Sequence, residues 1–260
     1  MVSCAGRGLP GAAVQYRLAC LLNRPGQSKE GFMKEKICVL SAVLLVAVVP
    51  VRSKSLLYQR RSAQGSTPVH AVIDTLENTF RISLTWQEKG GEVTHIVETD
   101  SSLETVSWRY RDEACNSDFR ACKKGERIML RGKHQGEEVQ REFELDGYAW
   151  LQMFPHEMAG FITSDAGTRY YRAIGIQGRS DMKMATFKAI KKGIEPIDLN
   201  GCSVDAVHVE ISLTGFLSMF WTGHYWFRES DGRYLRFEGN MGGPGSEQVV
   251  TEFQLQSRAP

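Results

Sequence analysis

The alternation of apolar and polar residues along most of the chain is the feature that most constrains its fold. In residues 205–215, "DAVHVEISLTG", Val207, Val209 and Ile211 alternate with polar side chains. Residues 79–86, "TFRISLTW", alternate in the same way. A period of two is typical of a strand with one buried and one exposed face, so the sequence predicts a mainly β protein.

Short turn signals separate the predicted strands. A glycine follows directly after Lys89, Gln135 and Asp231, and turns of this kind join neighbouring strands into antiparallel hairpins. The segments between turns amount to about nine or ten strands. We therefore expect one curved antiparallel sheet, an open or half barrel wrapped around an apolar interior.

One segment departs from the period of two. In residues 147–161, "GYAWLQMFPHEMAGF", the large apolar side chains fall at spacings of four, four and three: Trp150, Phe154, Met158 and Phe161. This spacing forms one stripe on a helix. Because Pro155 lies inside the stripe, the helix should be short, be kinked, or begin there. We expect this helix to pack on the inner face of the sheet.

The N-terminal region is predicted to be an export signal. Residues 37–51 form an apolar run that is shorter than a membrane-spanning helix of roughly 20 residues. Lys34 and Lys36 precede the run and small residues end it, so the segment from Met33 to Ser53 is interpreted as a secretory signal peptide. An uncleaved membrane anchor and a buried core helix are the alternatives.

The remaining boundaries follow from this interpretation. Residues 1–32 precede the signal and are interpreted as a start-site artefact or a disordered extension. The polar residues 54–73 are expected to form a flexible lead-in, and residues 74–260 a single β domain. The protein is accordingly expected to be periplasmic or secreted.

Three of the six cysteines, Cys115, Cys122 and Cys202, lie beyond the predicted signal. In an oxidising compartment, Cys115 and Cys122 could close a small disulfide loop, "CNSDFRAC". Free thiols are the equally open alternative. Cys202 is interpreted as structural.

The composition argues against several functions. The net charge is only +2 and the chain has no block of five or six like charges, whereas nucleic-acid-binding domains usually present a clustered basic face. H-E-x-x-H, C-x-x-C and G-x-S-x-G motifs are all absent from the sequence. We therefore predict no metal site, no cofactor and no catalytic residue.

Aromatic residues give the best candidate for a ligand site. Residues 220–239, "FWTGHYWFRESDGRYLRFEG", form a predicted hairpin, in which Tyr225 and Phe227 point to one face and Trp226 to the other. Part of this cluster should be core, and Trp226 should be covered by the helix stripe. The remainder is predicted to line a cavity for an apolar ligand such as a lipid, with these residues: Trp150, Phe154, Met158, Trp221, His224, Tyr225 and Trp226.

Two motifs also carry a resemblance to a known group. The residues Asp146, Gly147, Trp150 and Gln152 form D-G-x-x-W-x-Q, and residues 225–239 form Y-W-F-R-x-x-D-G-x-x-x-R-F-E-G. Over about the last 120 residues the chain resembles a group of uncharacterised secreted bacterial proteins, which implies no established activity. More loosely, it resembles the periplasmic half-barrels that carry lipoproteins, and that resemblance is architectural.

Three functional hypotheses follow. The first is an exported, non-enzymatic protein that binds or carries an apolar ligand. The second is a structural or interaction module of the envelope without a small ligand. The third is a hydrolase, for which outward carboxylates such as Glu142 and Glu144 could form a catalytic pair.

Overall fold

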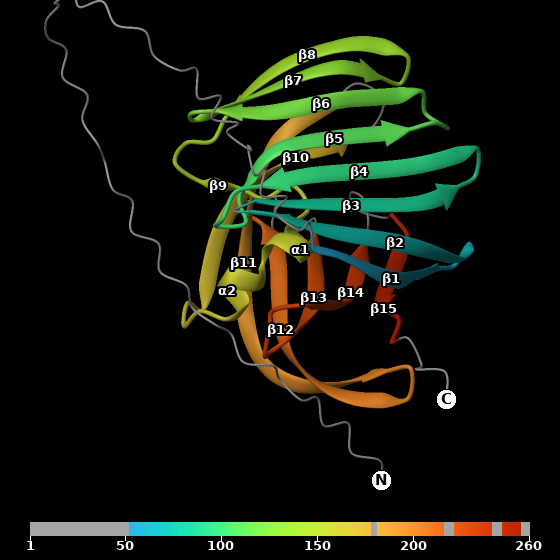
Figure 1. Cartoon of the computed structure of the whole chain (residues 1–260), viewed down its shortest axis with the longest axis vertical. Coiled ribbons are helices and arrows are strands. Elements are labelled where there is room, and N and C mark those ends of the chain that lie inside the picture. Colours follow the sequence, from blue (N-terminus) through green and yellow to red (C-terminus); the bar gives the residue numbers. More distant parts are fainter. Residues whose placement is uncertain (1–51, 78, 178–180, 216–220, 241–245, 256–260) are drawn as a thin grey trace, which may run out of the picture. The chain divides into compact units, whose positions relative to one another are not determined.

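The described part of the chain is built on one open sheet of 15 strands (Figure 1). The computed structural model describes residues 52–77, 79–177, 181–215, 221–240 and 246–255. The strands lie in the order β8-β7-β6-β5-β4-β3-β2-β1-β15-β14-β13-β12-β11-β10-β9. Their bounds are β1 Arg52–Ser62, β2 Gly65–Leu76, β3 Thr79–Glu88, β4 Gly91–Thr99, β5 Thr105–Asp112, β6 Ser117–Lys124, β7 Arg127–His134, β8 Glu137–Glu144, β9 Ala149–Trp150, β10 Thr168–Gln177, β11 Asp181–Leu199, β12 Cys202–Leu213, β13 Thr222–Arg228, β14 Tyr234–Asn240 and β15 Gln248–Phe253.

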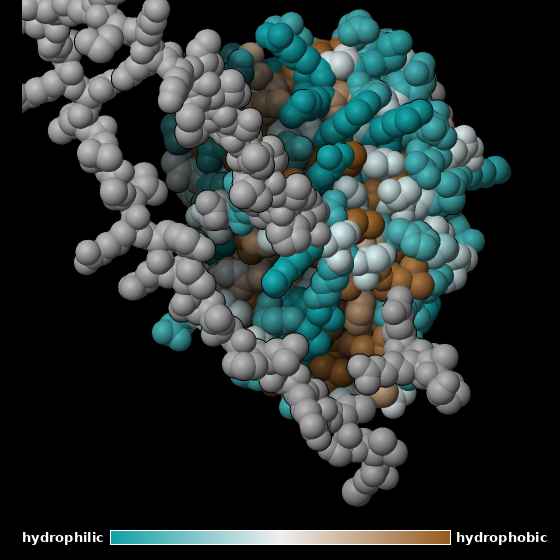
Figure 2. Space-filling model, viewed as in Figure 1, coloured by the Kyte–Doolittle hydropathy of each residue, from teal (hydrophilic) through white to brown (hydrophobic). Residues whose placement is uncertain are grey.

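The sheet consists of two meanders, which are joined where the first strand of the sequence, β1, pairs with the last, β15. β1 pairs antiparallel with β15, with Tyr58 opposite Phe253, so the strands β1–β8 and β9–β15 form two wings of one sheet. Figure 1 shows the sheet curling so that the β9–β15 wing lies behind the β1–β8 wing. The curled sheet encloses the apolar residues, whereas the visible outer side of the β1–β8 wing is largely hydrophilic (Figure 2).

The prediction of a mainly β protein with an open curved antiparallel sheet is confirmed, but the strand number is wrong. β1 and β2 occupy residues 54–73, which were expected to be a flexible lead-in. Each of these strands buries only two apolar side chains, Leu56 and Tyr58 in β1 and Val69 and Ala71 in β2. With so few apolar residues, the alternation of apolar and polar side chains in this segment is weak. The two strands are held in the sheet because each pairs with a strand on both sides.

The predicted N-terminal segments fall almost entirely outside the described residues. The extension 1–32 and the apolar run 37–51 are not described, and only Arg52 and Ser53 of the predicted signal are. These two residues begin β1, so cleavage after Ser53 would remove the start of that strand. Among the described residues, no helix has the length and apolar character needed to cross a membrane.

The predicted single short helix is two helices of one turn each. α1 comprises Phe154–Glu157 and α2 comprises Ala159–Ile162, and both are flanked by Met158. Pro155 lies in the first turn of α1, where its missing N–H has no helical acceptor to lose. Trp150 belongs to β9 rather than to a helix, so the predicted stripe is correct only from Phe154 onward.

The proposed disulfide is contradicted. Cys115 and Cys122 are both free. Cys115 lies in the β5–β6 turn, while Cys122 lies five residues beyond Ser117 along β6. At about 3.3 Å per residue, the separation is far greater than the roughly 7 Å between Cα atoms that a disulfide tolerates. Cys202 is exposed at the start of β12.

The D-G-x-x-W-x-Q motif has a clear structural role at the end of the sheet. Gly147 has a φ of 76° in the turn before β9, a conformation that glycine adopts readily. Asp146 forms an ion pair with Arg172 at 2.6 Å. The Gln152 side chain bonds the backbone of β10 as a neighbouring strand would. Its Nε2 donates to the Ile174 carbonyl and its Oε1 accepts the Ile174 N–H, each at 3.0 Å.

Candidate functional site

A row of rings crosses the inner face of the β1–β8 wing. It consists of Trp86 on β3, His95 on β4, Tyr110 on β5 and Phe119 on β6, and we call it the aromatic row. The ring centroids are 5.2 Å apart for Trp86 and His95, 4.7 Å for His95 and Tyr110, and 5.1 Å for Tyr110 and Phe119. His95, Tyr110 and Phe119 lie directly opposite one another on adjacent strands, where side chains on one face interact.

The aromatic row lies near one end of the curled sheet and is partly open to solvent. Trp86, His95 and Tyr110 are partly exposed, whereas Phe119 is buried. The strand registers place the β1–β2, β3–β4, β5–β6 and β7–β8 turns at this end. The partly exposed side chains of the aromatic row therefore lie beside these turns.

A few polar groups adjoin the aromatic row. The Tyr110 hydroxyl donates to Asp112 Oδ2 at 3.0 Å, and Trp86 Nε1 donates to Glu88 Oε1 at 2.8 Å. The Arg60 guanidinium lies 5.4 Å from the centre of the Trp86 ring. An apolar surface with a small number of placed polar groups is the usual composition of a ligand site.

The two titratable rings of the row are neutral at neutral pH. Burial lowers the pKa of His95 to about 4, which the Asp112 carboxylate offsets only in part. Burial first, and then the neighbouring Asp112, raises the pKa of Tyr110 above its usual value. Neither ring therefore brings a charge to the surface, as an apolar ligand requires.

Three of the predicted ligand residues form a second group of rings on the other wing and α1. Phe154 lies 5.6 Å from Tyr171 and 5.4 Å from Tyr225, and Phe187 lies 5.6 Å from Trp221, all between ring centroids. Phe154, Phe187 and Trp221 are partly buried and pack against the same apolar cluster as Trp86. Phe154, Trp221 and Tyr225 therefore share one apolar cluster with Trp86 of the aromatic row.

Two other predicted residues, Trp150 and Met158, have no exposed surface. Trp150 packs with the apolar cluster beneath β5–β7, and its Nε1 donates to Gln152 Oε1 at 2.9 Å. Met158 packs between the two wings beside Phe161. Both side chains fill the core in this structure.

His224 and Trp226 lie on the opposite face of the sheet from Tyr225. Here the indole of Trp226 stacks on His208 at 4.8 Å, and its Nε1 donates to Glu195 Oε1 at 2.6 Å. The prediction that the helix covers Trp226 is therefore wrong. The helix packs on the inner face, whereas His208 and Arg236 cover the indole on the outer face.

The aromatic row is not among the residues predicted from the sequence. Trp86 and Tyr110 continue the apolar face of their strands, whereas His95 shares the face of Val93 and Val97 but is not itself an apolar residue. The meeting of these rings depends on the register of β3, β4 and β5, which is a property of hairpin geometry. In the part of the chain that the structure describes, no group of three or more His, Cys, Asp or Glu is arranged to hold a metal ion.

Comparison with known proteins identifies the fold alone. No family model matches the chain, and no curated protein matches it. The structure is similar to a β-barrel-like protein of the domain of unknown function DUF1849 from Brucella abortus, with a TM-score of 0.51 and 8% identity over 78% of this chain and 95% of that one.

Two further solved structures show weaker similarity. The hypothetical lipoprotein YmcC from Escherichia coli has a TM-score of 0.38 and 11% identity, over 79% of this chain and 85% of its own. A LolA superfamily protein from Nitrosomonas europaea has a TM-score of 0.22 and 8% identity, over 80% and 87%. Both scores are below the level that indicates a common fold. The chain therefore has a β-barrel-like fold of the type seen in the Brucella protein.

Proposed function

We propose that the protein is an exported, non-enzymatic binding or carrier protein that holds an apolar ligand, such as a lipid or acyl chain, inside its curled sheet. The observation that carries this proposal is the aromatic row, in which three neutral rings remain partly exposed on the inner face. Trp86 and Tyr110 pack against the apolar clusters of the interior but are not enclosed by them.

The ligand chemistry follows from the surface. The rings of Trp86, His95 and Tyr110 offer apolar faces and carry no charge. Covering such a surface contributes about 25 cal/mol for each Å² removed from water. Arg60 and Glu88 flank Trp86 at the rim, so a polar head group would lie at the rim and its chain would run inward.

Removing the Trp86 ring should weaken binding of a fluorescent fatty-acid probe by about tenfold. The estimate assumes that the ligand no longer covers about 50 Å² of ring surface, at about 25 cal/mol per Å². Affinity is measured by titrating the purified protein with the probe and by displacing the probe with unlabelled lipid. Native mass spectrometry of the freshly purified protein should also detect a bound lipid.

The matched control is Trp226→Ala, which removes an indole from the outer face of the same sheet. This variant should bind the probe as the unaltered protein does. Circular dichroism establishes that both variants are folded before affinities are compared. Equal affinity in the Trp86→Ala variant and the unaltered protein, or loss of binding only in the Trp226→Ala variant, would exclude the inner face as the site.

A further inference from the structure

The outer face of the β1–β8 wing carries a row of like charges that the proposed carrier function does not use. Arg109 on β5, Arg120 on β6 and Arg131 on β7 lie directly opposite one another on adjacent strands. Adjacent strands are about 4.8 Å apart, and like charges in this arrangement destabilise a sheet. We call these three residues the arginine ladder.

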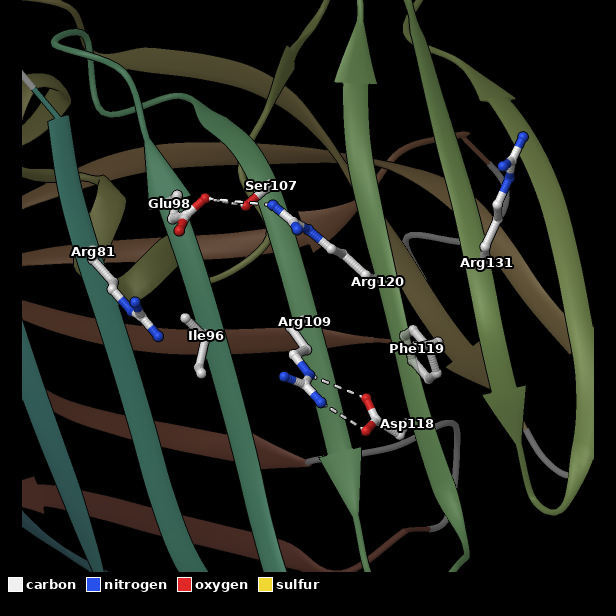
Figure 3. A pocket seen from close by; sticks show the side chains of 9 residues that line it. All are labelled: Arg81, Ile96, Glu98, Ser107, Arg109, Asp118, Phe119, Arg120 and Arg131. Atoms are coloured by element: carbon white, nitrogen blue, oxygen red, sulfur yellow. Dashed lines mark hydrogen bonds and ion pairs between the residues drawn. The ribbon is translucent and has the colours of Figure 1, made fainter.

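The arginine ladder is only partly neutralised by carboxylates. Asp118 accepts two hydrogen bonds from Arg109, at 3.1 and 2.8 Å. Arg120 reaches across β5 toward Glu98, but their closest N–O distance is 3.8 Å (Figure 3). In the described ranges of the chain, no carboxylate forms an ion pair with Arg131. Positive charge therefore increases along the ladder from Arg109 to Arg131.

The ladder forms part of a groove with a volume of about 440 Å³. Arg81 on β3 adds a fourth guanidinium, and it too has no ion pair with a carboxylate among the residues that the structure covers. Four arginines and two carboxylates line the groove, so its net charge is positive. These side chains lie on the neighbouring strands β3 to β7, and Figure 3 shows Ser107 between Glu98 and Arg120.

From this arrangement we infer that the groove binds a phosphate group. A guanidinium presents its N–H donors as a planar fork that matches two oxygens of a phosphate. A bound phosphate would accept hydrogen bonds from the exposed Arg120 and Arg131, which lie opposite each other on adjacent strands, and would reduce the repulsion along the ladder. The inference does not depend on the ligand of the inner face, because the two surfaces lie on opposite sides of the sheet.

The phosphate can come from a soluble compound or from a lipid head group, and one experiment distinguishes the two sources. Inorganic pyrophosphate is titrated into the full chain by calorimetry, and binding to phosphatidylglycerol vesicles is measured by co-sedimentation against phosphatidylcholine vesicles. Binding to pyrophosphate alone assigns a soluble ligand. Binding to the phosphatidylglycerol vesicles assigns a membrane head group. Binding to neither overturns the inference.

Substitutions connect the binding to the arginine ladder. Arg131→Gln should weaken binding of whichever probe binds by about tenfold, because a charge-assisted hydrogen bond is lost. Without the anion, the same variant should have an unchanged or higher unfolding temperature, since one repulsive charge is gone. Pyrophosphate should raise the unfolding temperature of the unaltered protein more than that of the variant.

The matched control is Arg127→Gln, on the same face of the same strand. Arg127 lies four residues from Arg131, about 13 Å at the usual rise per residue, and pairs with Glu142 at 2.7 Å outside the groove. Both substitutions remove one positive charge. Equal loss of binding in the two variants would show non-specific attraction to a basic surface and would overturn the assigned site.

Discussion

The Trp150→Ala variant should be less stable than the unaltered protein by about 3–5 kcal/mol, the usual cost of removing a buried large aromatic side chain. Trp150 is fully buried and packs with the apolar cluster beneath β5–β7. Its removal leaves a cavity between this cluster and β10, and the surrounding structure can close such a cavity only in part.

The loss should extend beyond the cavity because Trp150 orients Gln152. Trp150 Nε1 donates to Gln152 Oε1, which also accepts the N–H of Ile174. The Gln152 backbone N–H donates to Thr105 Oγ1 at 2.9 Å. Without the indole, the segment before α1 loses the contact that fixes it between β5 and β10. Trp150→Phe should cost less, because it keeps most of the apolar volume.

The stability is measured by urea denaturation at constant pH, with Tyr148→Ala as the control. Tyr148 lies two residues earlier, is 40% exposed, and contacts Arg172 through its ring face at 5.9 Å. An exposed contact of this kind is worth about 0.5–1 kcal/mol. Similar losses in the Trp150→Ala and Tyr148→Ala variants would mean that the buried indole does not hold the segment in place.

The regular strands could be predicted from the sequence because their signal is local. Val207, Val209 and Ile211 are all buried, as the alternation predicts, and the hairpin at Asp231–Gly232 joins β13 and β14. In a strand, each side chain's face depends only on its position. This is why Trp226 was correctly separated from Tyr225, although its neighbours on the outer face were not predicted.

The features that escaped prediction depend on contacts between distant residues. β1 pairs with β15 almost 200 residues away in sequence and has few apolar side chains of its own. Trp150 and Phe154 share a helical spacing, but Trp150 pairs with β10 as part of β9. The aromatic row likewise requires the register of several hairpins. Local periodicity carries none of this information.

A second large effect is expected from pH, and it centres on Glu157 in α1. Its carboxylate is fully buried, with Oε1 2.5 Å from Thr105 Oγ1 and Oε2 accepting the Met153 N–H at 2.6 Å. Burial raises the pKa of Glu157 to about 8, although these two hydrogen bonds and Arg169 oppose the rise. The nearby Asp100 adds to the rise.

The direction of the pH effect follows from proton binding. Between the unfolded pKa of 4.5 and the folded pKa of about 8, the folded protein holds one more proton at Glu157 than the unfolded chain does. The free energy of unfolding therefore falls as the pH rises through this range. His95 and His156 act oppositely at lower pH, because burial lowers the pKa of each from 6.5 to about 4.

These opposing effects predict maximal stability near pH 6.5. Below this pH, the two histidines take up protons more readily in the unfolded chain, and their combined effect exceeds that of Glu157. Above it, the effect of Glu157 exceeds the remaining effect of the two histidines, which lose their last protons in the unfolded chain just above pH 6.5. Between pH 6.5 and pH 8, the free energy of unfolding should therefore fall by about 1 kcal/mol, since one pKa unit corresponds to about 1.4 kcal/mol and the histidines offset part of the effect of Glu157.

Glu157→Gln should abolish this fall above pH 6.5, because the amide resembles the protonated acid in shape and cannot ionise. It can still accept the Met153 N–H and donate to Thr105 Oγ1, so the variant should remain folded. Urea denaturation of both proteins at pH 6.5 and pH 8 measures the difference. The control is Glu144→Gln, an exposed carboxylate on β8, which should leave the profile unchanged. If the Glu157→Gln variant still lost stability between these two pH values, the ionisation of another group would have to be responsible, and α1 would not be held by a protonated acid.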